Sequence, residues 1–173
     1  MSNWKRPESG AAPEQAVGGV HAIRGRLDAG RYRIAIVAAI FNDKIVDTLL
    51  EGALGAWKKH GGATANLLVA RVPGAFELPV AARQLAVSGK YDAVIALGAV
   101  IRGDTPHFEY VAGECASGLQ RVACDTGIPT IFGVLTVNTF EQADERASLS
   151  RGNKGAESME VALEMADLLA QIK

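Results

Sequence analysis

The stretch "YDAVIALGAVIRGDTPHFEYV", residues 91–111, joins an apolar segment to a sharp turn and then to an amphipathic segment. Residues 91–101 form an almost continuous apolar run, which is typical of a strand buried on both faces. After the turn, Thr105 suits the N-cap of a helix and Pro106 suits its first position, where the missing N–H removes no hydrogen bond. We therefore predict a buried parallel strand followed directly by a helix over residues 106–125.

The rest of the chain repeats this alternation of short apolar runs and amphipathic segments. We predict further strands at 33–40, 66–72 and 128–137, and further helices at 43–61, 75–89, 139–147 and 155–171. The pattern indicates an α/β fold, a three-layer α/β/α sandwich with a central four-stranded parallel sheet and flavodoxin-like winding. In such folds ligands bind beyond the carboxyl ends of the strands, so the residues after each strand are candidates for a site.

Periodicity within two of the predicted helices indicates which faces are buried. The stripes consist of Val46, Leu49, Leu50, Ala53 and Trp57 in the first helix, and of Val161, Met165, Leu168 and Leu169 in the last. Thr139, with Gln142 three residues later, forms a capping-box pattern at the start of the 139–147 helix. Residues 20–27 alternate weakly, which is compatible with one strand, including a strand on a neighbouring subunit.

Length and charge narrow the class of protein. The 173 residues fit one domain, and we predict a flexible tail over residues 1–19 and a single domain over 20–173. Because 18 basic residues balance 19 acidic ones without a basic stripe, the sequence does not indicate nucleic acid as a partner. No apolar run approaches the roughly 20 residues of a membrane span, so we expect a cytoplasmic protein without a membrane partner.

Cysteine and histidine spacing does not suggest a metal site. Cys115 and Cys124 fall in one predicted helix, about 13 Å apart along its axis, which is too far for a disulfide within the subunit. We expect both to be small buried side chains. His21 and His60 stand alone, so no spacing suits zinc.

The turn after the 91–101 strand has the features of an anion site. Gly103, Asp104 and Thr105 lead into a helix start, where free N–H groups and the helix dipole favour phosphate. His107 stands in the first turn, where the dipole and a bound phosphate would act on its charge in opposite directions, as suits a general acid or base. An ordinary capped helix start with a surface histidine remains the alternative.

Further candidates follow the other strands. Arg146 and Lys154 flank a Gly/Ser-containing loop and suit a phosphate clamp, with solvated helix-end charge as the alternative. Phe41, Phe76 and Phe132 all stand at strand exits, where an aromatic ring can stack on a planar heterocycle or pack into the core beneath a loop.

These segments together resemble the lumazine synthase family. The resemblance runs from about residue 20 to the C-terminus and rests on Phe41-Asn42, "VPGAFELP" at 72–79, residues 91–111, "FGVLT" at 132–136 and "EQADERASLSRGNKG" at 141–155. It implies a transferase of riboflavin biosynthesis without a metal or organic cofactor. The implied reaction condenses 5-amino-6-(D-ribitylamino)uracil with 3,4-dihydroxy-2-butanone 4-phosphate to 6,7-dimethyl-8-ribityllumazine, phosphate and water.

The resemblance also implies a role for each candidate residue. His107 matches the acid–base histidine of the family. The phosphate-binding positions match Gly103, Asp104, Thr105, Arg146 and Lys154. The positions that bind the pyrimidine and its ribityl chain match Phe41, Ala75, Phe76, Glu77, Ala99, Val100, Ile101 and Phe132. Glu77 also suits a plain dipole partner at a helix start, and Phe132 matches a wall that the adjacent subunit supplies.

The sequence leaves the oligomeric state and the presence of catalytic turnover open. The family forms homopentamers with active sites at subunit interfaces, and some members build a sixty-subunit icosahedral shell. Asp104 stands where the family often has Gly or Ala, and Ser150 and Arg151 also depart from the common loop. A flavin-binding or shell-forming protein without turnover is the alternative function, and the residues without the resemblance would indicate a generic phosphate-binding domain.

Overall fold

A computed structural model describes residues 19–172 of the chain, and the predicted tail lies outside these residues except for Gly19. The strands are β1 (Ile34–Ala39), β2 (Leu67–Val72), β3 (Ala93–Ile101) and β4 (Thr130–Val137). The helices are α1 (Asp43–Lys59), α2 (Leu78–Val87), α3 (His107–Thr126), α4 (Phe140–Ala147) and α5 (Lys154–Ile172). Short 3₁₀ helices span Ala29–Arg31, Thr64–Asn66 and Ala75–Glu77.

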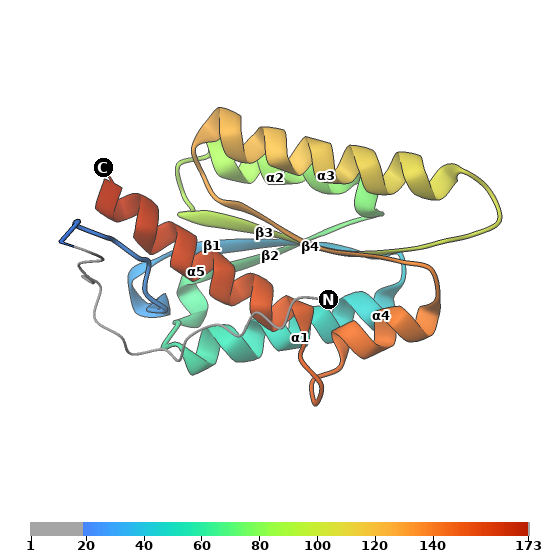
Figure 1. Cartoon of the computed structure of the whole chain (residues 1–173), viewed down its shortest axis with the longest axis horizontal. Coiled ribbons are helices and arrows are strands. Elements are labelled where there is room, and N and C mark those ends of the chain that lie inside the picture. Colours follow the sequence, from blue (N-terminus) through green and yellow to red (C-terminus); the bar gives the residue numbers. More distant parts are fainter. Residues whose placement is uncertain (1–18, 173) are drawn as a thin grey trace.

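The four strands form one parallel sheet in the order β2-β1-β3-β4. Helices α2 and α3 cover one face, and α1, α4 and α5 cover the other, which confirms the predicted three-layer sandwich (Figure 1). Because α1 follows β1 on one face and α3 follows β3 on the other, the chain leaves these neighbouring strands in opposite directions (Figure 1). A crevice at their carboxyl ends is the usual result of this arrangement.

Alternate residues of the central strands belong to two separate cores. On β1, Ile34 and Ile36 face the core beneath α1 and α5, whereas Ala35 and Val37 face the core beneath α2 and α3. All six β1 residues are buried, as expected of a strand covered on both faces. The two edge strands are less covered, and β2 alternates between half-buried and exposed residues.

The predicted stripe of α1 is confirmed, because Val46, Leu49, Ala53 and Trp57 are buried and Leu50 is half-buried. At the end of α1 the N–H of Gly61 donates to the carbonyl of Lys58 at 3.1 Å. Gly61 has φ +84°, in the left-handed region that stops a helix and that glycine adopts without strain.

The predicted stripe of α5 is wrong. The predicted residues, which are only half-buried, are Val161, Met165, Leu168 and Leu169. The buried face instead carries Met159, Ala162, Leu163 and Ala166. The reason is the close approach of α5 to α1: a Cβ on Gly155 would lie 1.8 Å from the carbonyl oxygen of Leu49. Gly155 permits this close approach, and Ala162 and Ala166 lie on the same buried face as Met159 and Leu163, whereas a pattern that omits alanine and glycine selects the neighbouring face.

Side chains cap two helices of this layer. Thr139 accepts a hydrogen bond from the N–H of Gln142 at 3.3 Å, which confirms the predicted cap of α4. Asn153, which is buried, accepts from the N–H of Ala156 at 2.9 Å and so caps α5. The Asn153 amide also donates to the carbonyl of Thr48 at 2.9 Å, so one side chain joins the start of α5 to α1.

Two further predictions concern the cysteines and membrane association. Cys115 is buried, and burial raises the pKa of its thiol to about 11, but Cys124 is exposed, so the prediction that both are buried is wrong for Cys124. The two remain free thiols. Among residues 19–172, each helix is too short or too polar to cross a membrane.

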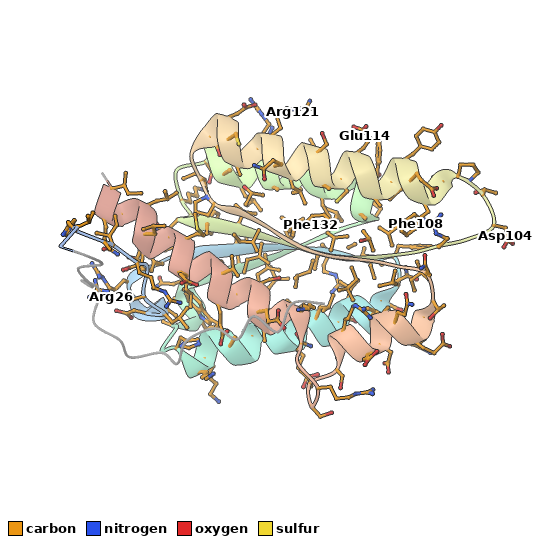
Figure 2. All side chains as sticks on the ribbon, viewed as in Figure 1. Arg26, Asp104, Phe108, Glu114, Arg121 and Phe132 are labelled. Carbon is orange, nitrogen blue, oxygen red and sulfur yellow. The ribbon has the colours of Figure 1, made fainter. Side chains whose placement is uncertain are left out.

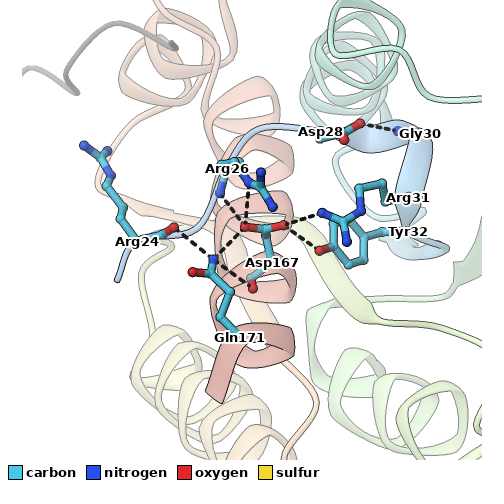
Figure 3. Close-up of polar contacts among 8 residues, drawn as sticks. All are labelled: Arg24, Arg26, Asp28, Gly30, Arg31, Tyr32, Asp167 and Gln171. Carbon is cyan, nitrogen blue, oxygen red and sulfur yellow. Dashed lines mark hydrogen bonds and ion pairs between the residues drawn. The ribbon is translucent and has the colours of Figure 1, made fainter. Parts of the chain in front are cut away.

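The strand predicted at residues 20–27 is not present in the single chain, where only Val20 and Ile23 hold isolated bridge positions. The segment instead runs along α5, and Figure 3 shows its contacts converging on Asp167. The Asp167 carboxylate accepts hydrogen bonds from the Tyr32 hydroxyl at 2.7 Å and the Arg26 N–H at 3.0 Å. Gln171 donates to it at 2.8 Å, and Arg31 lies 3.5 Å away.

These contacts keep Asp167 ionised although its side chain is only 2% exposed. Burial alone would raise the pKa of this carboxyl, but the hydrogen bonds from Tyr32 and the Arg26 amide, together with the Arg26 charge, lower it. Burial and the hydrogen bond to Asp167 raise the pKa of Tyr32 to about 12. Asp167 therefore holds Arg26, Arg31 and Tyr32, which precede β1, against α5.

Replacing Asp167→Asn should lower the free energy of unfolding at pH 7 by about 1–3 kcal/mol, because buried donors lose a charged acceptor. The lowered pKa of Asp167 means that its contribution is present above the unfolded pKa of about 3.9 and is lost as the pH falls through the folded value. Urea unfolding at pH 7 and pH 3 should thus show a difference between wild type and variant that shrinks in acid. The exposed Asp125→Asn is the matched control, and an equal effect of both variants would contradict this account.

Candidate active site

A cavity of about 810 Å³ lies at the carboxyl ends of β1, β2 and β3. We name it the first cavity. Its walls come from the residues after each of these strands and from the first turn of α3. It is lined by Phe41, Asn42, Pro73, Gly74, Ala75, Phe76, Glu77, Ala99, Val100, Ile101, Gly103, Thr105, His107, Phe108, Tyr110 and Val111. The cavity therefore occupies the crevice that the opposite exits of β1 and β3 create.

The exit of β1 shapes one wall. Asn42 adopts the left-handed conformation with φ 62°, which turns the chain from β1 into α1. Its side-chain amide donates to the carbonyl of Ala99 at 2.8 Å and so ties the exit of β1 to β3. Phe41, the preceding residue, is 70% exposed. An aromatic ring this exposed does not pack in the core, which excludes the alternative for Phe41 in the single chain.

The exit of β2 shapes the adjoining part of the wall. The N–H of Phe41 donates to the carbonyl of Pro73 at 3.0 Å, so the backbones of the two exits run side by side. The 3₁₀ helix Ala75–Glu77 follows and leads into α2, with Pro79 in the first turn. Phe76 is 57% exposed and also lines the cavity. Two exposed aromatic rings thus line the same cavity as Ala99, Val100 and Ile101 of β3, and an aromatic ring can stack on a planar ligand.

The turn after β3 brings His107 to the cavity, but the helix starts one residue later than predicted. Pro106 rather than Thr105 is the N-cap of α3, and His107 is its first residue. Thr105 makes no capping hydrogen bond because its side chain is one position too early, so the amides of His107 and Phe108 have no side-chain partner among the described residues. Within the described residues the His107 imidazole makes no hydrogen bond, and it is exposed on the cavity wall.

Asp104 is a predicted site residue of this turn that does not line the cavity. Gly103 and Thr105 line the cavity on either side of it. Figure 2 shows Asp104 at the outer tip of the loop, away from the sheet. Its carboxylate therefore does not add negative charge to the cavity wall, and the backbone of the turn is the part that a ligand can reach.

A second cavity, of about 570 Å³, lies beside β4 and collects the remaining predicted site residues. Phe132 on β4 is 43% exposed there, and Arg146 of α4 and Lys154 of α5 also line it. β4 is an edge strand, so this cavity opens beside an unpaired strand edge. None of these three residues lines the first cavity, and Figure 2 shows Phe132 on β4 apart from Phe108 at the start of α3.

The two cations of the second cavity differ in their freedom to bind an anion. Arg146 donates to the carbonyl of Gln142 at 2.9 Å, which leaves most of its five N–H donors unused. Lys154 is paired with Glu157 at 2.6 Å. Arg146 is therefore the better-prepared anion ligand of the two.

Phe108 and Tyr110 also line the first cavity, although the sequence patterns did not single them out. A signal was present for Tyr110, because residues three apart on a helix lie on the same face and His107 was already a candidate. For Phe108 the sequence carried no comparable signal. Its position depends on a contact with Arg102 that only the folded chain reveals.

A protein-family model matches most of the chain. The model described as 6,7-dimethyl-8-ribityllumazine synthase matches residues 31–170. The match includes all four strands, both cavities and every predicted site residue.

Proposed function

The chain belongs to the 6,7-dimethyl-8-ribityllumazine synthase family, and from this membership we propose the reaction that it catalyses. The family is one of transferase enzymes with a role in riboflavin biosynthesis. The proposed reaction condenses 5-amino-6-(D-ribitylamino)uracil with 3,4-dihydroxy-2-butanone 4-phosphate. It yields 6,7-dimethyl-8-ribityllumazine, phosphate and water.

The observation that carries the proposal is the composition of the first cavity. It combines exposed rings, the end of β3, a helix start without a side-chain cap and a histidine without a hydrogen-bond partner among the described residues. Phe41 stacks on the pyrimidine, and the backbone of Ala99–Ile101 pairs with the polar edge of that ring. Ala75, Phe76 and Glu77 receive the ribityl chain. The turn at Gly103–Thr105 lies at the opposite end and receives the phosphate.

In the proposed mechanism His107 moves the protons that the condensation requires. The amine attacks the ketone, and a first water leaves to give an imine. Phosphate is then eliminated, and attack of the second nitrogen on the remaining carbonyl closes the ring with loss of a second water. Each step transfers a proton to or from nitrogen, carbon or a leaving oxygen, which an imidazole does well near neutral pH. Holding the two substrates together in one cavity supplies a further part of the acceleration.

The second cavity supports a site that two subunits share. Members of the family form oligomers, and we propose a homopentamer in which the second cavity of one subunit faces the first cavity of its neighbour. Phe132 then closes the aromatic wall, and Arg146 and Lys154 reach the phosphate. The half-buried apolar stripe of α5, from Val161 to Leu169, is available to the same interface. A sixty-subunit shell is a further assembly of such pentamers, and sedimentation separates the two.

The chain should form a product with the absorbance and fluorescence of ribityllumazine when both substrates are present. His107→Ala should lower kcat by roughly ten- to a hundred-fold, because general acid–base catalysis contributes at least that much. Steady-state kinetics from pH 6 to pH 8 measures the loss. His21→Ala, an exposed histidine outside both cavities, is the control and should retain the wild-type rate.

Wild-type turnover by His107→Ala would remove the proposed role of this residue. Tight riboflavin binding by the wild-type chain without lumazine formation would instead favour the alternative function, a flavin-binding or shell-forming protein.

Arg146→Ala should raise KM for the butanone phosphate by roughly ten-fold or more, since a charged hydrogen bond to phosphate contributes about 1.5–3 kcal/mol. KM for the pyrimidine should change little, because Arg146 is proposed to contact only the phosphate. The neighbouring Arg151→Ala provides a matched loss of charge outside both cavities. Equal effects of the two substitutions would show that general positive charge, rather than Arg146, binds the phosphate.

A further inference from the structure

Arg102, the residue directly after β3, joins three elements at the rim of the first cavity without lining it. Its Nε donates to Oδ1 of Asn138 at 3.1 Å, and its Nη1 forms an ion pair with Glu109. The guanidinium carbon lies 4.2 Å from the centre of the Phe108 ring. Its backbone N–H donates to the carbonyl of Val137 at 2.9 Å and extends the pairing of β3 with β4.

The partners of Arg102 are themselves held. The N–H of Asn138 donates to the side chain of Gln142 at 2.9 Å, in the first turn of α4. Hydrogen bonding to Arg102 and to its own backbone amide lowers the pKa of Glu109, so this carboxylate stays ionised near neutral pH. The Arg102 guanidinium is thus held by Asn138 after β4, and it contacts α3 through the Glu109 carboxylate and the Phe108 ring.

The start of α3 has few other restraints. No side chain caps the helix, and the side chains of residues 103–106 make no hydrogen bond to the described residues. A Cβ on Gly103 would meet no other atom within 4 Å. The connection between β3 and His107 is therefore exposed. Beside the packing of Phe108 on the core beneath α2 and α3, the contacts of Arg102 are the side-chain restraints on the first turn among the described residues.

We propose that Arg102 is a positioning residue for the reaction, which clamps the first turn of α3 and thereby holds His107 and Phe108 on the wall of the first cavity. This inference rests on the proposed function. An exposed ion pair alone contributes little to stability, so the effect depends on geometry. A planar guanidinium can stack on a ring and donate from its edge in two directions at once, whereas an ammonium cannot.

The first test is kinetic and uses the wild-type chain, Arg102→Ala, Arg102→Lys and the double variant Arg102→Ala/His107→Ala. Arg102→Ala should lower kcat on the order of ten-fold, since small misplacements of a catalytic group have effects of this size or larger. Arg102→Lys should remain impaired because it keeps the charge and loses the planar contacts. In the His107→Ala background, loss of Arg102 should have little further effect, because the group that it positions is already absent.

The second test measures position without turnover. Hydrogen exchange in a peptide spanning residues 102–110 should accelerate in Arg102→Ala and stay unchanged in Arg121→Ala, which removes an exposed arginine at the far end of α3 (Figure 2). Wild-type kcat or unchanged exchange in Arg102→Ala would overturn the proposal. So would full activity of Arg102→Lys, or additive losses in the double variant. If the wild-type chain makes no lumazine, the proposed function fails, and the role of Arg102 in the reaction fails with it.

Discussion

The common direction of the four strands is the constraint on which the rest of the molecule depends. Parallel neighbours cannot be joined by a tight turn, so each crossover carries a helix, and the buried central strands need helices on both faces. All carboxyl ends then meet at one edge of the sheet. Because the chain leaves β1 and β3 toward opposite faces, that edge opens into the first cavity, and residues far apart in sequence line it together.

The sequence predicts this arrangement because β1 and β3 are continuous apolar runs between amphipathic segments. Phe41, Phe76 and His107 could be placed near one another from topology alone, since each lies in the connection after the carboxyl end of a strand. The buried face of α5 could not be predicted, because packing against α1 selects small residues such as Ala162 over the larger Val161. The path of residues 20–27 along α5 could not be predicted from the sequence either, since it depends on contacts with the distant, buried carboxylate of Asp167.

The start of α3 shows where local signals fail. Thr105 and Pro106 predict a capped helix, yet the helix begins one residue later without a side-chain cap. The restraint comes from Arg102, which follows β3 and contacts Phe108 of α3 and Asn138 after β4. A helix pattern in the sequence does not reveal these contacts. Because α3 has no side-chain cap, the amides of His107 and Phe108 stay available to an anion. The contacts of Arg102 with Glu109 and Phe108 preserve the position of His107.

The separation of the predicted site into two cavities is the feature that most constrains the proposed mechanism. His107 lines one cavity and Arg146 the other, so a site that contains both requires two subunits. The most direct test co-expresses His107→Ala and Arg146→Ala subunits with different tags and measures the activity of purified mixed oligomers. Shared sites predict that about a quarter of the interfaces regain both residues at equal mixing. At a butanone phosphate concentration far below the KM of the Arg146→Ala parent, the activity of the mixture should then be well above that of either parent. Activity equal to the average of the two parents would contradict a site shared between subunits.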